Sequence, residues 1–335
     1  MLLTRFLIRT ALTPKMDEPK PIPGAEKLDI KPEFEKRYKD LLGEDYAVFM
    51  KYSLSFLRRS IRVNTIKIEV NDLKKRLEKT WKLTQIPWWP EGFWIEHKQG
   101  ERRDIGNTLE HSLGYFYVQE AASMIPPIVL EPKPGEIVLD MCAAPGSKAT
   151  QIAAMMKNKG VLVANDVSGL RLRPLSINLQ RSGVTNAIVT LMSGQAFRNI
   201  SFDKVLLDAP CSGTGNIRRS LKTLETWNPG MVKRLAGIQR RLIETALNIL
   251  KPNGTLVYST CSLEPEEDEA IIDFIANKYK DSIKIEKISV KGLKSSQPIL
   301  EFENNNYDKN IKNCLRIWPQ DNDSEGFFVA KIKKM

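Results

Sequence analysis

The sequence predicts an α/β protein in which a doubly wound sheet follows a smaller α+β amino-terminal domain. Three observations support this fold class. From Gly135 onward, short apolar segments alternate with longer helical patterns. The apolar segments are nearly continuous in Val, Ile and Leu, which is typical of parallel strands covered on both faces. The region before position 112 instead mixes helical stretches, an isolated strand pattern and several tryptophans.

The length and the apolar content set the domain organisation. A chain of 335 residues with 42% apolar residues is long enough for one large core or two unequal ones. We predict a disordered tail over 1–27, the α+β domain over 28–112 and the α/β domain over 113–335. The basic, acid-free start over 1–12 is compatible with a targeting segment, but we favour a disordered tail, with Met16 as an alternative start of translation.

Within the amino-terminal domain, the patterns predict a helical stretch from Phe34 to Leu57, a strand from Ile61 to Ile68 and a charged helix from Asn71 to Thr80. Four tryptophans cluster near its end: Trp81, Trp88, Trp89 and Trp94. Aromatic side chains in such a cluster either pack in a core or stack on RNA bases. We favour packing.

In the second domain we predict six parallel strands, at 137–141, 161–165, 187–191, 204–207, 255–259 and 327–332. Helices fill the intervals. One of them runs from Met231 to Ile249, with apolar residues at three- and four-residue steps, and it stops at Lys251-Pro252-Asn253-Gly254. Its basic residues lie mainly on the opposite face, where we favour contact with solvent over contact with RNA. The Lys- and Asn-rich segment 281–316 predicts a variable strand and a long surface loop.

The amino-acid composition limits the possible binding partners and the cellular compartment of the protein. A formal net charge of +11 and a pI of about 9.3 favour a polyanionic partner, and nucleic acid is the first candidate. An anionic membrane surface would also suit the charge, but no stretch approaches the roughly 18 apolar residues of a spanning helix. The four cysteines are far apart, with no Cys-x-x-Cys pair and only two histidines, which argues against a zinc site and a disulfide framework. We therefore expect free thiols, no metal and a cytoplasmic location.

The first segment that carries chemistry follows the first predicted strand of the α/β domain. It runs from Cys142 to Lys148 and is rich in small residues, which let the backbone approach a ligand. A helix begins near Gly146, and its free N–H groups suit an anion or a carboxylate. The segment contains neither the G-x-G-x-x-G fingerprint of dinucleotide sites nor the spacing of a Walker A loop.

The second segment is the acid that ends the next strand, Asp166. An acid at this place takes the two hydroxyls of a ribose in nucleotide-binding α/β folds, although an acid there also serves as a helix cap. Together with the small-residue loop upstream, Asp166 favours a cofactor that contains a ribose and needs no phosphate site. S-adenosylmethionine fits this description.

The third element is a pair of cysteines, Cys211 and Cys261, each at the end of a predicted strand. Side chains that leave a parallel sheet at the carboxyl ends of its strands meet in one crevice, so we expect the two thiols to converge beside Asp208. This arrangement indicates covalent chemistry. The other two cysteines, Cys142 and Cys314, are more typical of inert buried thiols.

A helix is expected directly after Cys261, opening at Leu263-Glu264-Pro265 with proline in the favoured first turn. Four acids follow in the sequence: Glu266, Glu267, Asp268 and Glu269. We expect them to complement the dipole of this helix rather than to take part in catalysis.

From about Tyr46 to its carboxyl terminus, the sequence resembles the RsmB/Sun (NSUN) family of RNA cytosine-5 methyltransferases. The matching stretches are Ser60 to Thr65, Tyr117 to Met124, Cys142 to Lys148, Asn165-Asp166 with Arg171, Asp208 to Gly213, Thr260-Cys261-Ser262 and Gly326-Phe327-Phe328. Two cysteine motifs in one chain are highly specific, since DNA cytosine methyltransferases with a single cysteine carry only the Pro-Cys motif. The resemblance implies a Rossmann-like methyltransferase sheet, S-adenosylmethionine as cofactor and RNA as substrate.

The resemblance also implies roles for individual residues. Cys261 would be the nucleophile and Cys211 the residue that assists product release, with Asp208 and Lys148 as their catalytic neighbours. The residues expected around the cofactor or the target base are Cys142, Ala143, Ala144, Pro145, Gly146, Ser147, Lys148, Asp166, Arg171, Ser193 and Asp208. Three positions depart from the family: Ser193 replaces an acid usual near the adenine, Ser147 replaces a second glycine, and Gln320 replaces a common histidine.

The implied chemistry requires a thiol. Carbon 5 of cytosine is a poor nucleophile, so a thiolate must first add to carbon 6. Lys148 or the positive end of a helix would lower the pKa of that thiol, and Asp208 would hydrogen-bond ring nitrogen 3 of an unstacked base. Cys211, or a base that it positions, would assist loss of the proton from carbon 5. Because Pro-Cys is the nucleophile in DNA cytosine methyltransferases, sequence order leaves the reverse assignment of the two cysteines open.

The expected substrate is RNA, with tRNA preferred over rRNA because the chain has no obvious RNA-binding domain beyond its small amino-terminal one. We expect a monomer. The alternatives are an rRNA cytosine-5 methyltransferase, a Rossmann methyltransferase acting on DNA or protein, and a non-catalytic RNA-binding assembly factor that keeps the fold as a scaffold.

Overall fold

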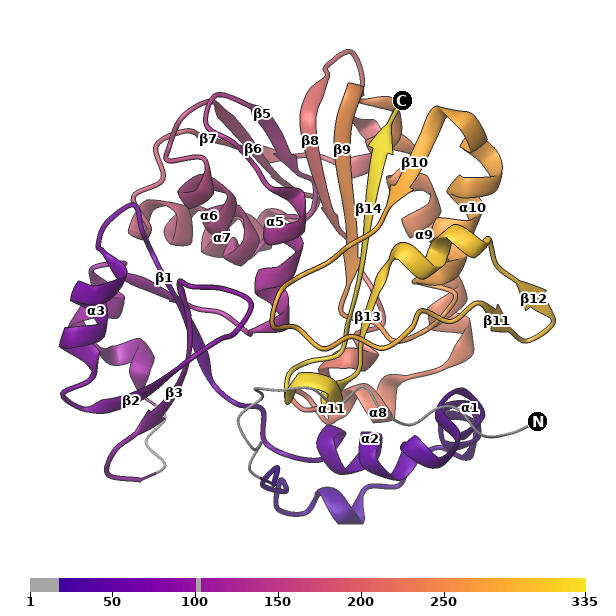
Figure 1. The fold of residues 1–335 in the computed structure, drawn as a ribbon, viewed down its shortest axis with the longest axis horizontal. Coiled ribbons are helices and arrows are strands. Elements are labelled where there is room, and N and C mark those ends of the chain that lie inside the picture. The colour runs from indigo at the N-terminus through magenta and orange to yellow at the C-terminus, as the bar shows by residue number, and fades with distance from the viewer. Residues whose placement is uncertain (1–17, 101–103) are drawn as a thin grey trace.

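The structure, a computed structural model, describes residues 18–100 and 104–335. The segment 1–17 lies outside the described residues, and with it the expected targeting segment and the alternative start at Met16. Two sheets organise the rest of the chain. A small antiparallel sheet lies beside a larger mixed sheet, and helices α1 (Pro32–Leu42) and α2 (Tyr46–Ser53) lie at the lower end of the larger one (Figure 1).

The small sheet contains four antiparallel strands within the described residues, in the order β2-β3-β1-β4. Its elements are β1 (Ser60–Val63), β2 (Trp81–Gln85), β3 (Gly92–His97) and β4 (Phe116–Val118), with helices α3 (Val70–Leu77) and α4 (Leu109–Ser112) beside them. The predicted strand over 61–68 is shorter than expected, because the chain turns at Asn64, whose carbonyl accepts a hydrogen bond from Lys67 N–H at 2.9 Å. Strand β4 pairs with β1, so this sheet extends past residue 112.

Three strands of the small sheet, β2, β3 and β4, were not predicted, and the tryptophan cluster lies on β2, on β3 and in the turn between them. The rings of Trp88 and Trp94 are both buried and lie 5.6 Å apart in an edge-to-face contact. Trp88 Nε1 donates a hydrogen bond to the Ala121 carbonyl at 3.1 Å. For these two residues the packing interpretation is confirmed.

The predicted helical stretch over 34–57 forms two helices, α1 and α2, and the first ends at Gly43, which has a φ of 56°.

The larger sheet contains eight strands within the described residues, in the order β10-β14-β9-β8-β5-β6-β7, with β13 paired to β14. Five of them run parallel: β5 (Ile137–Asp140), β6 (Val161–Asp166), β7 (Ala187–Leu191), β8 (Phe202–Asp208) and β9 (Leu250–Thr260). They correspond to five predicted strands, and their order is that of a doubly wound sheet. β9 begins earlier than expected and includes 251–254, the predicted helix stop.

The sixth predicted strand, β14 (Phe327–Lys334), runs antiparallel to β9, so the expectation of an all-parallel sheet is wrong at this edge. β10 (Ile283–Glu286) and β13 (Leu315–Ile317) also pair antiparallel with β14. A parallel strand needs a crossover before it, usually a long helix. Instead, the chain between β10 and β14 forms short elements: β11 (Glu301–Phe302), β12 (Asn305–Asn306), β13 and α11 (Pro319–Asn322).

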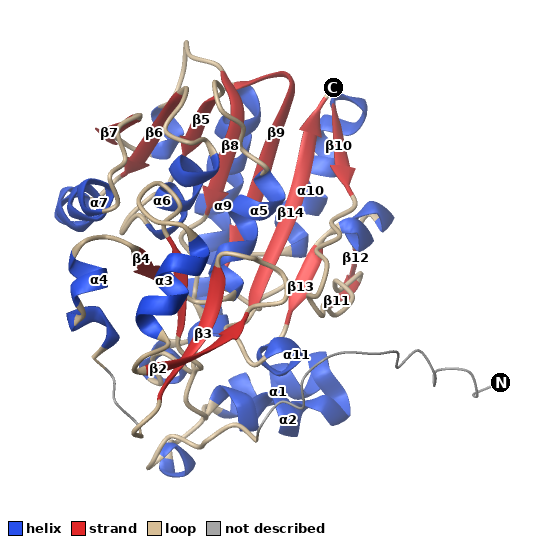
Figure 2. Ribbon diagram, turned by 60° about the vertical axis from the view of Figure 1, so that its left-hand side comes forward, coloured by secondary structure: helices blue, strands red, loops and turns tan. Residues whose placement is uncertain are grey.

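Helices cover both faces of the larger sheet (Figure 2). One face carries α5 (Ile125–Leu130), α6 (Ser147–Met155) and α7 (Gly169–Arg181), and the other carries α9 (Pro229–Asn248) and α10 (Glu269–Tyr279). The predicted helix from Met231 is confirmed as α9, which Asn228 caps by accepting a hydrogen bond from Met231 N–H at 2.8 Å. Two apolar cores, one on each face, confirm the doubly wound α/β fold.

A third apolar cluster joins the amino-terminal helices to the larger domain. Phe34 of α1 lies edge-to-face against Trp227, 5.3 Å between ring centroids, and Phe49 of α2 contacts Trp318. Trp227 directly follows α8 (Lys222–Thr226). The amino-terminal helices therefore pack on the segments that follow β8 and precede β14. Of the helices in the described part of the chain, none is long and apolar enough to cross a membrane.

Candidate active site

The predicted cofactor loop lies at the carboxyl end of the central strand β5 and leads into α6. Its Ala143 N–H donates a hydrogen bond to the Asn165 carbonyl in β6 at 2.7 Å, so the loop is fastened to the neighbouring strand. Gly146 has a φ of 105°, and a Cβ there would lie 3.0 Å from Leu175 Cδ1. Glycine suits both the positive φ and the close packing. The loop thus presents its backbone at the edge where parallel strands place ligands.

Asp166 ends β6 beside this loop. It is buried, its Oδ2 accepts a hydrogen bond from Ala144 N–H at 3.3 Å, and its Oδ1 accepts one from Ser168 N–H at 3.0 Å. Arg171 of α7 pairs with Asp166 at 3.4 Å and donates to the Ala144 carbonyl at 2.6 Å. The structure therefore brings together three predicted parts of the site: the loop, the acid and the arginine.

Asp140, the last residue of β5, was not predicted as a site residue. Its side chain is buried, and among the described residues no side chain donates a hydrogen bond to its carboxyl group, which lies near the Cys142 backbone N–H. Burial, together with the negative charge of Asp208, raises the pKa of Asp140 to about 8. A buried carboxyl without a side-chain partner fits a ligand that brings a hydrogen-bond donor or a positive charge. The signal that could have identified it is its position, an acid at a strand end like Asp166.

The two predicted cysteines lie in contact, with the Sγ atoms of Cys211 and Cys261 3.2 Å apart. They meet because β8 and β9 are adjacent and parallel, so the loops that leave both strands reach one crevice. The four cysteines of the chain are all described, and all are free thiols. The hydrogen bond between the two thiols lowers the pKa of Cys261 and raises that of Cys211, because one thiol of the pair ionises while the other keeps its proton.

Lys148 and Asp208 form an ion pair beside the thiols. Lys148 Nζ donates to Asp208 Oδ2 at 2.6 Å, and Ser259 Oγ donates to the other oxygen at 2.8 Å. Burial alone would lower the pKa of Lys148, but Asp208 and the nearby Cys261 raise it above its usual value. The ammonium therefore stays charged. Its charge lowers the pKa of Cys261 and so favours the thiolate.

The remaining predicted residues lie around this centre or away from it. Ser193 follows β7, and its hydroxyl accepts a hydrogen bond from Gln195 N–H at 3.3 Å. The Cys142 thiol is part of the cofactor loop, and burial raises its pKa. Cys314 is buried, and burial raises its pKa as well. Both thiols are therefore protonated, which is typical of inert cysteines.

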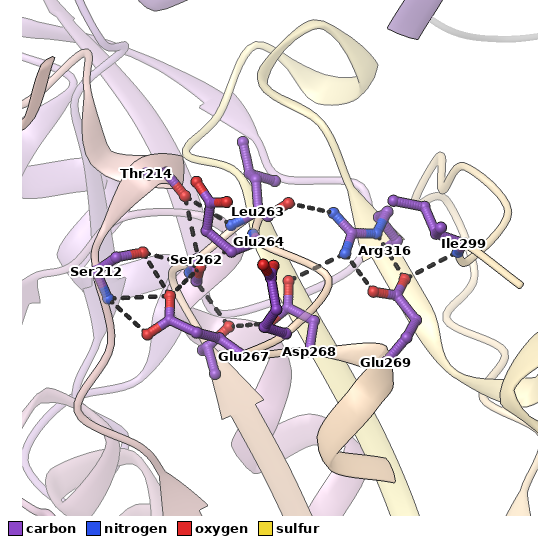
Figure 3. A network of polar contacts seen from close by, with 12 residues as sticks. Ser212, Thr214, Ser262, Leu263, Glu264, Glu267, Asp268, Glu269, Ile299 and Arg316 are labelled. Carbon is purple, nitrogen blue, oxygen red and sulfur yellow. Dashed lines mark hydrogen bonds and ion pairs between the residues drawn. The ribbon is translucent and has the colours of Figure 1, made fainter. Parts of the chain in front are cut away.

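The acids that follow Cys261 form a buried network and not the start of a helix (Figure 3). Because α10 begins at Glu269 with Asp268 as its N-cap, the predicted helix start at 263–265 is wrong, and Glu266 and Glu267 lie before the helix. Glu267 accepts hydrogen bonds from Ser212 and Ser262, the residues next to the two cysteines. Ser262 is five residues from Glu267 in the sequence, whereas Ser212 is 55 residues away and only the fold brings it to this carboxylate.

Two other acids of the network pair with one buried guanidinium. Arg316 lies 2.5 Å from Glu269 and 3.1 Å from Asp268, and all three side chains are fully buried. Arg316→Met is expected to lower the free energy of unfolding by about 3–5 kcal/mol, because it leaves two buried carboxyl groups without their cation. Urea denaturation measures this loss.

Lys36→Ala is the matched control for that prediction. It removes an ion pair with Asp40 in which the side chains are 79% and 62% exposed. We expect a change below about 1 kcal/mol, because solvent screens such pairs. Equal losses in the two variants would contradict the stabilising role of the buried network.

The order of the parallel strands, with an antiparallel β14 beside β9 and a cofactor loop that lacks the phosphate-binding fingerprint, puts the protein in the class of Rossmann-like methyltransferases. Comparison with models of known protein families identifies the family within this class. The model described as 16S rRNA methyltransferase RsmB/F matches residues 127–333, and the N-terminal domain of 16S rRNA methyltransferase RsmF matches residues 30–121. The chain belongs to the RsmB/F methyltransferase family, so the resemblance inferred from the sequence is confirmed.

Individual relatives agree with this membership. The tRNA (cytosine(49)-C(5))-methyltransferase of Pyrococcus abyssi is 44% identical over 315 residues, which cover 92% of this chain and 99% of that protein. The ribosomal RNA small subunit methyltransferase F of Aliivibrio salmonicida is 44% identical over 83% of this chain, but the match spans 58% of that longer protein. A crystal structure of a methyltransferase homolog protein from Pyrococcus horikoshii has a TM-score of 0.81 and 39% identity, covering 94% of this chain and all of that one.

Proposed function

We propose that the chain is a tRNA cytosine-5 methyltransferase that uses S-adenosylmethionine and forms a covalent bond between Cys261 and carbon 6 of the target cytosine. The observation that carries this proposal is the 3.2 Å contact between the Cys261 and Cys211 sulfur atoms, next to the ion pair of Lys148 and Asp208. Family membership supplies the reaction class, methyl transfer to RNA. The thiol pair supplies a nucleophile and a neighbour that exchanges protons.

Cys261 acts first in the proposed mechanism. Its thiolate adds to carbon 6, and the ring electrons make carbon 5 nucleophilic. Asp208, which Lys148 and Ser259 hold in place, accepts a hydrogen bond from ring nitrogen 3 once that nitrogen is protonated. When bound, the cofactor supplies an electrophilic methyl group to carbon 5.

Cys211 acts after methyl transfer. While Cys261 is free, the hydrogen bond between the two thiols raises the pKa of Cys211. Once Cys261 is bonded to the base, that charge is gone, so Cys211 ionises more easily. It then takes the proton from carbon 5, or positions a base that does so. The bond between carbon 6 and the Cys261 sulfur breaks in the same elimination, which releases the methylated base.

The cofactor fits the groups at the ends of β5 and β6. We assign it the loop from Cys142 to Lys148, with Asp166 for the ribose hydroxyls and Arg171, Ser193 and Asp208 nearby. Asp140 adds a buried carboxyl that lacks a side-chain hydrogen-bond partner among the described residues. The positively charged ammonium of the methionine part of S-adenosylmethionine suits this carboxyl.

Asp166→Ala is expected to weaken binding of S-adenosylmethionine by about 10- to 100-fold, since it removes two hydrogen bonds to a charged acceptor. Isothermal calorimetry measures the dissociation constant without RNA. Asp40→Ala, which changes an exposed acid on α1, is the control and should bind the cofactor normally. Normal binding by Asp166→Ala would rule out the ribose role.

The choice of tRNA over rRNA rests on the extent of the matches. The relative named for tRNA is matched over 99% of its length, whereas the chain spans 58% of the relative named for rRNA. An rRNA substrate is the second candidate, because the matching family model is described as a 16S rRNA methyltransferase.

The two candidate substrates are separated by direct assay. The purified chain is incubated with methyl-labelled S-adenosylmethionine and either tRNA or small-subunit rRNA, and bisulfite sequencing locates the product. We expect label in tRNA, and cytosine 49 is the first position to examine because the Pyrococcus abyssi relative is named for it. Label confined to rRNA would support the second candidate, and label in neither RNA would overturn the proposed function.

A further inference from the structure

Glu267 is a buried carboxylate that bridges the two cysteine loops, and the mechanism above does not use it. From the loop after β8, Ser212 N–H donates to its two oxygens at 3.0 and 3.1 Å, and Ser212 Oγ also contacts it. From the loop after β9, Ser262 Oγ donates to it at 2.5 Å. Dashed lines in Figure 3 join both serines to this carboxylate. Ser212 and Ser262 directly follow Cys211 and Cys261 in the sequence.

We propose that Glu267 is a positioning residue that holds the Cys211 and Cys261 thiols in contact by tying Ser212 to Ser262. This inference rests on the proposed function, because the contact matters only if the two thiols work as a pair. Glu267 itself touches neither the base nor the cofactor in this proposal. It acts through the backbone of the two loops.

The anchoring of Glu267 supports a rigid bridge. Tyr258 of β9 donates its hydroxyl to the Glu267 carbonyl at 2.5 Å, so the backbone of Glu267 is fixed to the strand that leads to Cys261. Gln239 of α9 donates to the Glu267 carboxylate at 3.1 Å and to the Pro210 carbonyl at 2.9 Å. Pro210 directly precedes Cys211. One helix and two loops thus converge on a single carboxylate.

The pKa of Cys261 distinguishes two possible roles of Glu267: holding the two thiols together, or changing the acidity of Cys261 through its charge. The negative charge of Glu267 raises the pKa of Cys261, whereas the hydrogen bond from Cys211 lowers it and is the larger influence. If Glu267 acted by its charge alone, a neutral replacement would make Cys261 more acidic. If it acts by holding the thiols together, the replacement loses the thiol hydrogen bond and makes Cys261 less acidic. The two roles therefore predict opposite shifts.

The loops retain other links when Glu267 is changed, so the fold should survive. Gly215 N–H donates to the Cys261 carbonyl at 2.9 Å, and Leu263 N–H donates to Thr214 Oγ1 at 2.9 Å. Glu267→Gln keeps the size of the side chain but removes the charged acceptor. In one orientation its amide NH₂ meets the donors Ser212 N–H and Gln239 Nε2, and in the other it replaces the oxygen that accepts both serine hydroxyls, so the charge-assisted hydrogen bonds of the bridge are lost in either. We expect this variant to remain folded while the two serines separate.

The test measures how fast the two thiols form a disulfide in protein without RNA. Diamide converts two neighbouring thiols into a disulfide: the thiols lose two electrons and two protons, and the diazene takes up both to become a hydrazine. Mass spectrometry of peptides follows the bond between Cys211 and Cys261. We expect Glu267→Gln to slow its formation at least 10-fold, and the pH profile of Cys261 alkylation by iodoacetamide to move to higher pH.

Glu266→Gln is the matched control, because Glu266 pairs with Arg37 and lies outside the bridge. It should form the disulfide at the wild-type rate. Ser212→Ala removes one hydroxyl of the bridge and should slow disulfide formation less than Glu267→Gln does. If urea denaturation shows that Glu267→Gln is unfolded, Ser212→Ala replaces it in the test. An unchanged disulfide rate, or alkylation of Cys261 at lower pH, would overturn the inference. Failure of the proposed function is separate, since it appears as methylation by a Cys261→Ala variant.

Discussion

Cys261→Ala is expected to reduce methylation of tRNA below about 10⁻⁴ of the wild-type rate, a loss of the size seen when a covalent nucleophile is removed. Without attack at carbon 6, carbon 5 of cytosine stays a poor nucleophile. No other cysteine is expected to replace Cys261. Burial raises the pKa of Cys142 and Cys314, and it still raises that of Cys211 when the contact with Cys261 is lost. Transfer of a labelled methyl group under single-turnover conditions measures the effect.

Two controls test whether the lower methylation rate of Cys261→Ala comes from the chemical step. Cys314→Ala changes a buried thiol that packs in the core between the sheet and α9 and α10, and it should methylate at close to the wild-type rate. Cys261→Ala should bind S-adenosylmethionine normally in calorimetry, since the cofactor loop and Asp166 are intact. If Cys261→Ala kept more than about 1% of the rate, the nucleophile would have to be another group.

Much of the site could be predicted from the sequence because its residues lie at the ends of apolar strands. Asp166, Cys211 and Cys261 each follow such a strand, and parallel strands carry their carboxyl ends to one edge. The direction of β14 could not be predicted in this way, since β14 inserts between β9 and β10 instead of extending an edge of the sheet. The roles of Glu267 and Arg316 were also missed, because their partners come from distant segments that only the packed fold brings together.

The amino-terminal domain is connected to the candidate active site by a buried arginine. Arg62 of β1 donates to the Ser147 carbonyl at 2.7 Å and to Thr150 Oγ1 at 2.9 Å, both in the first turn of α6. This helix begins at the cofactor loop and carries Lys148. The stretch from Ser60 to Thr65, which resembles the family, includes this arginine. It therefore fixes the small sheet on α6, the helix that carries Lys148.

Cys211→Ala is expected to accumulate a covalent complex of protein and RNA that survives a denaturing gel. The variant loses the hydrogen bond that lowers the pKa of Cys261, but Lys148 still favours the thiolate, so attack at carbon 6 continues. Methyl transfer follows. Removal of the proton from carbon 5 then lacks the neighbouring thiol, so the adduct breaks down slowly and builds up.

The reverse assignment of the two cysteines gives the opposite pattern, and this makes the experiment decisive. Sequence order left that assignment open. The proposed mechanism takes Cys261 as the nucleophile, and Lys148 lowers the pKa of its thiol. The complex formed by Cys211→Ala should be absent from the double variant Cys211→Ala/Cys261→Ala. A complex that forms with Cys261→Ala, but not with Cys211→Ala, would exchange the two roles and make the thiol that follows Pro210 the nucleophile.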